Sequence, residues 1–422
     1  MNAWVAARAF VFFGFRTLSG YRAVVEDSIA FVLALGRALH RYGTPADRLE
    51  EALKVSCQRL GIEAEVFTAP TALIMSFGAP TELKTRMLRF ETAELDMGKL
   101  ETVDDIADDV IDRKMTPREG IAQLEAVVAA KPRFGHGLST LMHGVTAGAL
   151  AVFFGGSLED VAVAAAIGLS LGLLAQYAKR STDQARVFEL VGAAFAAFTA
   201  GVVSSVWHAV TPSLVTIAAL IVLLPGMSLT VAMTELATRH LIAGTARLVS
   251  AVIVLLQLVV GVALGERGAA ALVDVHQAVP VPLPAWAPWI ALVASSISVA
   301  IVVQAQTRAF VWILAASVVG YTGNVVGTKW LGGQLGVMLG AFALGVLGNG
   351  YARLLKRPAQ VVLVPAVLLL VPGSMGFRGM TSLLSRDTLT GVETVFAMFV
   401  VAIAIVAGLL IANAVVSPRR SL

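Results

Sequence analysis

The stretch PGMSLTVAMTELATRHLIAG, residues 225–244, has a counterpart in PGSMGFRGMTSLLSRDTLTG, residues 372–391. Both follow the pattern P-G-x6-M-T-x-L-x2-R-x4-G, so seven of twenty positions are identical at an offset of 147 residues. So many identities at one offset are hard to obtain by chance, even in a chain of biased composition. The sequence therefore predicts an internal repeat.

Each copy opens with a Pro-Gly pair that lies well inside an apolar run. Proline removes a backbone donor and clashes with the preceding helical turn, and glycine permits conformations that other residues resist. About 13 residues of helix, or roughly 20 Å, precede each break, which places it at depth in a membrane. Unwound backbone at that depth is tolerated only where it lines a cavity or is buried in protein. We therefore expect Pro225, Gly226, Pro372 and Gly373 to line a substrate site, with the positive ends of two half-helices directed at an anionic group.

Around the repeat, the composition divides the chain in two. The 422 residues have a mean hydropathy of +0.80 and only 14% charged residues. Residues 1–135 hold 36 charged residues, whereas residues 136–422 hold 24. This division predicts a soluble part followed by a membrane part and excludes an ordinary soluble globule. Cys57 is the only cysteine, so no disulfide can form within the chain.

The membrane part is expected to be a polytopic α-helical domain with about ten spans. The predicted domains are a first five-helix repeat over 136–265, an external loop over 266–285 and a second repeat over 286–422. The expected spans are 137–155, 158–178, 186–206, 212–233, 245–265, 286–305, 308–327, 331–350, 359–377 and 391–415. Because five is odd, the second copy must enter the membrane in the opposite sense, which gives an inverted-topology repeat.

Lysine and arginine predict the orientation. With the N-terminal part on the cytoplasmic side, eleven cations of the membrane part fall on the inner side and four on the outer side, as the positive-inside rule requires. Both termini are then cytoplasmic. The net charge of +4 is explained by these loops, so no nucleic-acid partner is expected.

Residues 1–135 predict a small cytoplasmic α+β domain, preceded by a possible interfacial helix over 4–15. Helical periodicity begins at Ile29, short strands are expected over 63–68, 71–77 and 85–90, and acidic helices follow. The sequence Thr116-Pro117-Arg118-Glu119 has the form of a helix-capping box.

Polar side chains near the two breaks are the candidates for chemistry. The two copies differ at Glu235, which corresponds to Ser382, and at Arg378, which corresponds to Val231. Ionisable groups in a membrane are costly and are often functional. The predicted substrate-binding side chains are Thr234, Arg378, Thr381 and Asn324, and the predicted proton-coupling residues are Glu235 and Glu189.

Other features carry less functional weight. His136 and His143 lie seven residues apart on one helical face, and we expect a packing or interfacial role for both. The chain has no Walker lysine, HExxH, CxxC or GxSxG motif, so ATP-driven transport, zinc chemistry, metals and cofactors are not expected.

The chain also resembles the threonine/serine exporter family. The N-terminal resemblance rests on Leu35-Gly36-Arg37-Ala38-Leu39, Tyr42 to Glu50, Leu60-Gly61 and Val66 to Thr71. The stretch Phe153-Phe154-Gly155-Gly156-Ser157, with Asp160, Ile167-Gly168 and Phe188-Glu189, is similar to the family's first spans. The second half, with Pro372-Gly373, is similar to a companion domain that is a separate polypeptide in some bacteria.

The resemblance implies efflux of threonine and serine across a bacterial inner membrane, driven by the proton motive force. Two-polypeptide relatives imply export of dicarboxylates such as succinate as the alternative. A passive channel, a membrane receptor and an intramembrane enzyme are the remaining rivals, and the sequence shows no catalytic pair for the last. The expected partners are a small-molecule substrate, protons and the lipid bilayer, with homo-oligomerisation possible.

Overall fold

A computed structural model describes residues 25–79, 81–90, 94–370, 373–384 and 387–417. The chain forms two compact units, one ending at Lys131 and the other beginning at Pro132. Pro372 and the apolar stretch 4–15 lie outside the described residues, so the roles expected for them stay predictions.

The N-terminal unit combines helices with a three-stranded antiparallel sheet in the order β1-β2-β3. Residues 25–41 are helical, and the remaining elements are α2 (Ala46–Arg59), β1 (Ala64–Ala69), β2 (Ala72–Phe77), β3 (Lys84–Arg89), α3 (Met97–Ile111) and α4 (Pro117–Ala129). Every second residue of β2 is buried, as expected for a sheet with one covered face. Thr116 and Glu119 form the predicted capping box at the start of α4.

Two titratable groups lie in the core of this unit. Burial raises the pKa of the Cys57 thiol to about 12 and also raises the pKa of Tyr42 to about 12. Both groups are therefore uncharged at neutral pH. Because the thiolate is the reactive form of cysteine, Cys57 is inert while this unit is folded.

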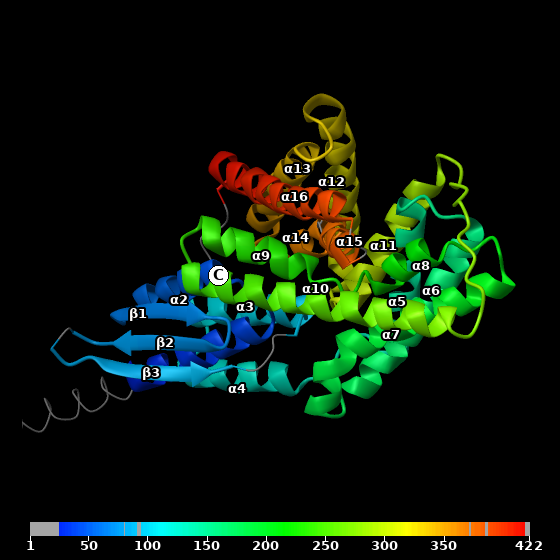
Figure 1. Cartoon of the computed structure of the whole chain (residues 1–422). Helices are drawn as coiled ribbons and strands as arrows, with labels where there is room; N and C mark the ends of the chain where they lie inside the picture. The colour runs from blue at the N-terminus through cyan, green and yellow to red at the C-terminus, as the bar shows by residue number, and fades with distance from the viewer. Residues whose placement is uncertain (1–24, 80, 91–93, 371–372, 385–386, 418–422) are drawn as a thin grey trace, which may run out of the picture. The chain divides into compact units, whose positions relative to one another are not determined.

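The C-terminal unit is built from helices (Figure 1). They are α5 (His136–Phe153), α6 (Leu158–Ala178), α7 (Thr182–Val206), α8 (Pro212–Leu220), α9 (Gly226–Ala237), α10 (Leu241–Ala270), α11 (Ala287–Val302), α12 (Phe310–Leu331), α13 (Gly336–Leu355), α14 (Gln360–Val367), α15 (Gly373–Leu384) and α16 (Thr388–Val415). A 3₁₀ turn, η1 (Thr307–Ala309), leads into α12.

Within the described ranges, six helices are long and apolar enough to cross a membrane, namely α6, α7, α10, α12 with its preceding turn, α13 and α16. The shorter α11 is also apolar. The chain is thus a polytopic helical membrane protein. The count of ten spans stays a prediction, because α5 and the short pairs α8–α9 and α14–α15 are not among these six helices.

Helix boundaries in the two halves agree at the offset of the repeat. α9 and α15 begin at Gly226 and Gly373, 147 residues apart, and each has 12 residues. α10 and α16 begin at Leu241 and Thr388, again 147 residues apart. Packing follows the same plan, since α9 contacts α10 and α16, and α15 contacts α16 and α10. Figure 1 shows each short helix beside its long partner.

Shared residues explain the turn that follows each half-helix. A Cβ on Gly244 would lie 2.7 Å from Leu236 Cγ, and a Cβ on Gly391 would lie 2.6 Å from Leu383 Cγ. In both copies the leucine that the two stretches share packs on the shared glycine. These identities therefore serve close helix packing.

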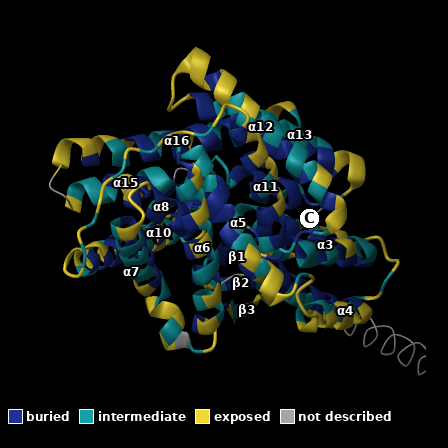
Figure 2. Ribbon diagram, turned by 90° about the vertical axis from the view of Figure 1, so that its right-hand side faces the viewer, coloured by how far each residue is buried: buried dark blue, intermediate teal, exposed yellow. Residues whose placement is uncertain are grey.

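The first helices of the two halves, α5 and α11, also pack together. A hydrogen bond of 2.9 Å joins Thr146 Oγ1 and Ser298 Oγ between them, and both side chains are buried. Figure 2 shows the buried residues of the helical unit between its helices and the exposed ones on outer faces and in loops. The halves are thus joined inside the unit, where polar groups must find partners.

Candidate functional site

The two helix breaks meet. α8 and α9 are separated by residues 221–225, and α14 and α15 by residues 368–372. A Cβ on Gly373 would lie 3.1 Å from Gly226 Cα and 3.3 Å from Leu224 Cβ. A side chain on Gly373 would fit only if its neighbours moved by a few tenths of an ångström, so the first residues of α9 and α15 lie in contact. Gly226 and Gly373, two of the predicted site residues, are therefore brought together from opposite halves.

The first break exposes backbone groups that have no backbone partner in the described part of the chain. α9 has no side-chain cap, and no hydrogen bond is found for the amides of Met227 and Ser228. The carbonyls of Ile221, Val222 and Leu223 likewise accept no backbone hydrogen bond there. Free amides at a helix N-terminus favour an anion, and free carbonyls favour a cation or a hydroxyl. This pattern suits a zwitterion.

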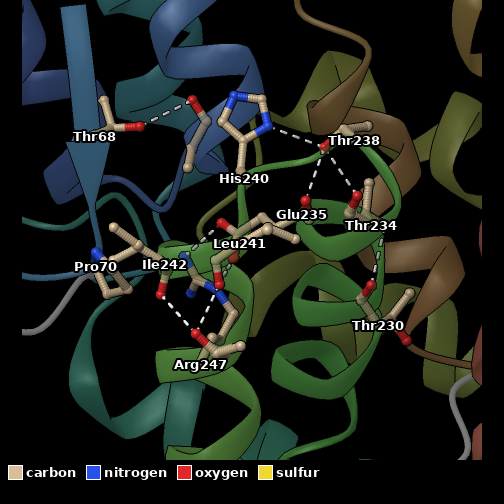
Figure 3. A network of polar contacts seen from close by, with 12 residues as sticks. Thr68, Pro70, Thr230, Thr234, Glu235, Thr238, His240, Leu241, Ile242 and Arg247 are labelled. Atoms are coloured by element: carbon tan, nitrogen blue, oxygen red, sulfur yellow. Dashed lines mark hydrogen bonds and ion pairs between the residues drawn. The ribbon is translucent and has the colours of Figure 1, made fainter.

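Threonines run along α9 away from the break. Figure 3 shows Thr230, Thr234 and Thr238 in a row along this helix. Thr234 Oγ1 donates to the carbonyl of Thr230 at 3.0 Å, and Thr238 Oγ1 donates to that of Thr234 at 2.9 Å. In α15 the matching Thr381 donates to the Phe377 carbonyl at 2.5 Å. The hydroxyl protons of Thr234 and Thr381 are thus used within their own helices, and their lone pairs are left to accept.

A buried ion pair joins α9 to α10. Glu235 Oε2 accepts from Arg247 Nε at 3.0 Å, and Glu235 Oε1 accepts from Arg247 Nη2 at 3.1 Å. The Glu235 side chain is fully buried and that of Arg247 is 29% exposed. Two parallel bonds of this kind fix both distance and direction. Figure 3 shows the arginine directed at the carboxylate.

Arg247 is a functional candidate that the sequence analysis missed. It was counted only among the inner-side cations, twelve residues beyond Glu235. Arg239, in the turn between the two helices, has a φ of +68° and reverses the chain. The signal was available in the repeat itself, because Glu235 and Arg247 correspond to Ser382 and Thr394, so both charges are missing together in the second half.

Arg378 contacts the first half from the second. Its guanidinium carbon lies 5.0 Å from the centre of the Phe154 ring, at the end of α5. Arginine over an aromatic face is a favourable arrangement. No carboxylate pairs with Arg378 among the residues that the structure describes. Its donors are therefore open to a ligand.

Two family models cover most of the chain. A model for threonine/serine exporters matches residues 30–268, and a second, described as threonine/serine exporter ThrE, matches residues 289–415. The first alone spans more than half of the sequence.

The chain belongs to the threonine/serine exporter family. It is therefore a multi-pass membrane protein of a transporter family, and the resemblance read from the sequence is confirmed.

The chain is also similar to fungal proteins. It is 29% identical over 367 residues to uncharacterized protein C7D4.12c of Schizosaccharomyces pombe, covering 83% of this chain and 48% of that protein. It is 29% identical over 371 residues to pheromone-regulated membrane protein 10 of Saccharomyces cerevisiae, covering 84% of this chain and 47% of that protein. The chain spans about half the length of these relatives. No solved structure matches it.

Two of the predicted site residues lie away from the contacts described so far. Asn324 lies on α12, where a Cβ on Gly340 of α13 would come within 3.2 Å of Asn324 Cβ. Glu189 lies near the start of α7 and is partly exposed. Neither residue is shown near Gly226 or Gly373.

No group of three or more His, Cys, Asp or Glu side chains able to hold a metal is found where the structure is described. The chemistry at the breaks is instead that of backbone amides and backbone carbonyls, with one open guanidinium on α15 and one ion pair near the far end of α9. These groups can bind and release a polar solute, and they form no arrangement of nucleophile and base.

Proposed function

We propose that the protein is a secondary exporter of small amino acids, threonine and serine, that works by alternating access. One observation carries the proposal: two half-helices begin side by side at Gly226 and Gly373, one from each half, at the middle of their interrupted helix pairs. The free amides of α9 would hold the substrate carboxylate, and the free carbonyls of residues 221–223 its ammonium group. When the site is open to the other side of the membrane, the side chain proposed to hold the carboxylate is that of Arg378.

We further propose that the two halves are an inverted-topology repeat with ten spans. The equal offsets of helix starts and the matching contacts of α9 and α15 support this arrangement. Two inverted copies allow one site to open to either side of a membrane. The distribution of lysine and arginine supports cytoplasmic termini. The location in a bacterial inner membrane is also part of this proposal, because the relatives named above are fungal.

Proton coupling is assigned to Glu235, with Glu189 as the second candidate. Protonation of Glu235 would remove the negative charge that holds Arg247 and would weaken the contact between α9 and α10. Ionisable groups buried in a membrane protein often serve such proton relays. The first half would then change its shape in response to a proton, whereas the counterparts of Glu235 and Arg247 in the second half, Ser382 and Thr394, carry no charge.

Transport can be tested directly in cells that express the full chain. Cells loaded with a threonine- or serine-containing dipeptide are followed for amino-acid release, with and without a proton uncoupler, and parallel cells are loaded with succinate. Uncoupler-sensitive release of threonine or serine is the expected result. Release that the uncoupler leaves unchanged would indicate a passive channel, and no release of any solute would support a receptor.

The site is tested by replacing Pro225-Gly226 with Ala-Ala. This variant should insert into the membrane in normal amounts and release no substrate. Normal export by the variant would contradict the assignment of the break as the site.

One observation favours the dicarboxylate alternative. Two helix N-termini in contact provide two positive ends, which would suit two carboxylates. Succinate release that exceeds threonine and serine release would decide for this alternative and would leave the broken-helix site in place.

A further inference from the structure

The stretch Phe153-Phe154-Gly155-Gly156-Ser157 forms the corner between α5 and α6, which we call the α5–α6 corner. Gly155 has a φ of +79°, a conformation that glycine adopts far more readily than other residues. A Cβ on Gly156 would lie 2.9 Å from the Ala151 carbonyl oxygen, so a side chain there would force the backbone to move. The two glycines therefore let the chain turn directly after Phe154.

Hydrogen bonds fix the α5–α6 corner within the first half. Asp160 Oδ2 accepts from the Ser157 amide at 3.0 Å, and the Asp160 amide donates to Ser157 Oγ at 3.2 Å. Asp160 Oδ1 accepts from the amide of Thr211, the residue that precedes α8, at 2.7 Å. The Asp160 side chain is fully buried. The corner is thus fixed to the start of α8.

Aromatic contacts fix the same corner to the second half. The ring centre of Phe153 lies 5.7 Å from that of Tyr321 on α12. The Tyr321 ring in turn lies 5.5 Å from the ring of Trp289 on α11, edge to face. Aromatic pairs at these distances attract one another. Phe153 therefore holds the end of α5, and the neighbouring Phe154 has a different partner.

The partner of Phe154 is Arg378, which lies five residues after the first residue of α15, Gly373. Its guanidinium carbon lies 5.0 Å from the centre of the Phe154 ring, over the ring. A guanidinium that stacks on a ring presents its flat face to it, so its N–H groups, which lie in its plane, point sideways. Those N–H groups are the ones that bind a carboxylate through two parallel hydrogen bonds.

We propose that Phe154 is a positioning residue for the substrate: its ring directs the Arg378 guanidinium before the substrate carboxylate arrives. This inference rests on the proposed function, because it takes Arg378 as a ligand of the carboxylate. Ordering a long side chain at the moment of binding weakens affinity, and a ring that orders it beforehand removes this cost. Because Phe154 belongs to the first half and Arg378 to the second, the guanidinium is directed only while these parts of the two halves meet.

The test measures binding of L-threonine and of succinate to the solubilised full chain, through the rise of the thermal midpoint with ligand concentration. Phe154→Leu keeps an apolar side chain and removes the ring. Its apparent Kd for the bound probe should rise about two- to tenfold. Phe154→Tyr keeps the ring face, so its Kd should stay close to that of the unaltered chain.

The neighbouring ring provides the matched control. Phe153→Leu removes the contact with Tyr321 and leaves the ring under Arg378 in place. It should lower the thermal midpoint of the ligand-free chain and leave the Kd unchanged. Equal rises of the Kd in Phe153→Leu and Phe154→Leu would show that the corner acts only through general packing and would overturn the inference.

A second comparison tests whether Phe154 acts through Arg378. In an Arg378→Lys background there is no planar guanidinium to direct. Phe154→Leu should therefore raise the Kd by a smaller factor there than in the unaltered chain, since the effects of coupled residues are not additive. The same factor in both backgrounds would overturn the positioning role.

The outcomes separate this inference from the proposed function. If the unaltered chain neither binds nor exports threonine or succinate, the proposed function fails. If it binds and exports one of them, and the Kd is the same in the unaltered chain, Phe154→Leu and Phe154→Tyr, the function stands and the role of Phe154 is overturned. If Phe154→Leu does not reach the membrane, Phe154→Met replaces it in the same comparisons, and an unchanged Kd in that variant overturns the inference.

Discussion

The two halves of the membrane unit share a backbone plan and differ in their charges. Both have a short helix, a break and a second short helix that has, near its end, a leucine packed against a glycine. Only the first half has the buried pair of Glu235 and Arg247, whose counterparts are Ser382 and Thr394. Only the second half has Arg378, whose counterpart is Val231.

This difference separates fold from chemistry. The identical residues pack helices, bond threonine hydroxyls to their own helix or break the helix. Among the residues that differ between the two copies are Glu235, which can hold a proton, and Arg378, which can hold a carboxylate. Under the proposed function, the shared backbone plan would serve opening to either side, and the unequal charges would serve proton coupling and substrate binding.

The largest expected effect comes from filling the contact between the halves. Gly373→Ala would place a Cβ 3.1 Å from Gly226 Cα, where backbone cannot yield as a flexible side chain can. We expect substrate release to fall below detection while the amount of protein in the membrane stays near normal. Release is measured in loaded cells, and the amount of protein in isolated membranes.

The matched control for this variant is Gly350→Ala on α13. A Cβ at Gly350 would meet nothing within 4 Å, so this alanine should be neutral or slightly stabilising in a helix. The N-terminal unit is checked separately through the single cysteine, because Cys57 is buried there and its pKa is raised to about 12. Maleimide labelling should stay slow in both variants, and normal release by Gly373→Ala would show that the breaks need no close contact.

A second effect tests the charged pair of the first half. Arg247→Ala leaves the fully buried Glu235 carboxylate without its guanidinium and should destabilise the unit by about 3–5 kcal/mol. Glu235→Ala should cost less, since the Arg247 side chain is 29% exposed and can turn toward polar surroundings. The measurement is the thermal midpoint of the solubilised protein, with Glu235→Ala, Arg247→Ala and the variant that carries both substitutions forming a double-mutant cycle.

The informative double variant gives the first half the residues of the second, Glu235→Ser with Arg247→Thr. It should recover most of the lost stability, because removing both members of a buried pair leaves no unpaired charge. It should nevertheless fail to couple export to protons. Uncoupler-sensitive export by this double variant would remove Glu235 from the mechanism.

Much of this comparison could be predicted from the sequence, because the two copies of the repeat can be recognised directly by their shared residues. The Pro-Gly breaks, the strands of the N-terminal unit and the capping box at Thr116 all depend on neighbouring residues. The pairing of Glu235 with Arg247 depends on a left-handed turn at Arg239, which no helical spacing predicts. The contact of Gly226 with Gly373 depends on the packing of helices far apart in the sequence.

A third effect should be equal in the two halves. Gly244→Ala would bring a Cβ to 2.7 Å from Leu236 Cγ, and Gly391→Ala to 2.6 Å from Leu383 Cγ. Overpacking of this kind costs about 1–3 kcal/mol. We expect the two variants to lower the thermal midpoint by similar amounts. A clearly larger effect in one half would mean that the shared residues do not do the same work in both copies.

The smallest effect on stability, and the one that most sharpens the comparison, concerns Arg378. Arg378→Val installs the residue of the first half and removes a guanidinium that lies 5.0 Å from the Phe154 ring. The loss of this contact should cost about 0.5–1 kcal/mol at a site with access to water. If Arg378 also binds the substrate carboxylate, export should fall far more than this small loss of stability explains.

Arg378→Lys separates the two roles, because lysine keeps the charge and loses the planar, two-pronged geometry. Export that falls in Arg378→Val, recovers only partly in Arg378→Lys and leaves the thermal midpoint nearly unchanged would assign Arg378 to the substrate. Export that follows the thermal midpoint in both variants would assign it to packing against Phe154 alone.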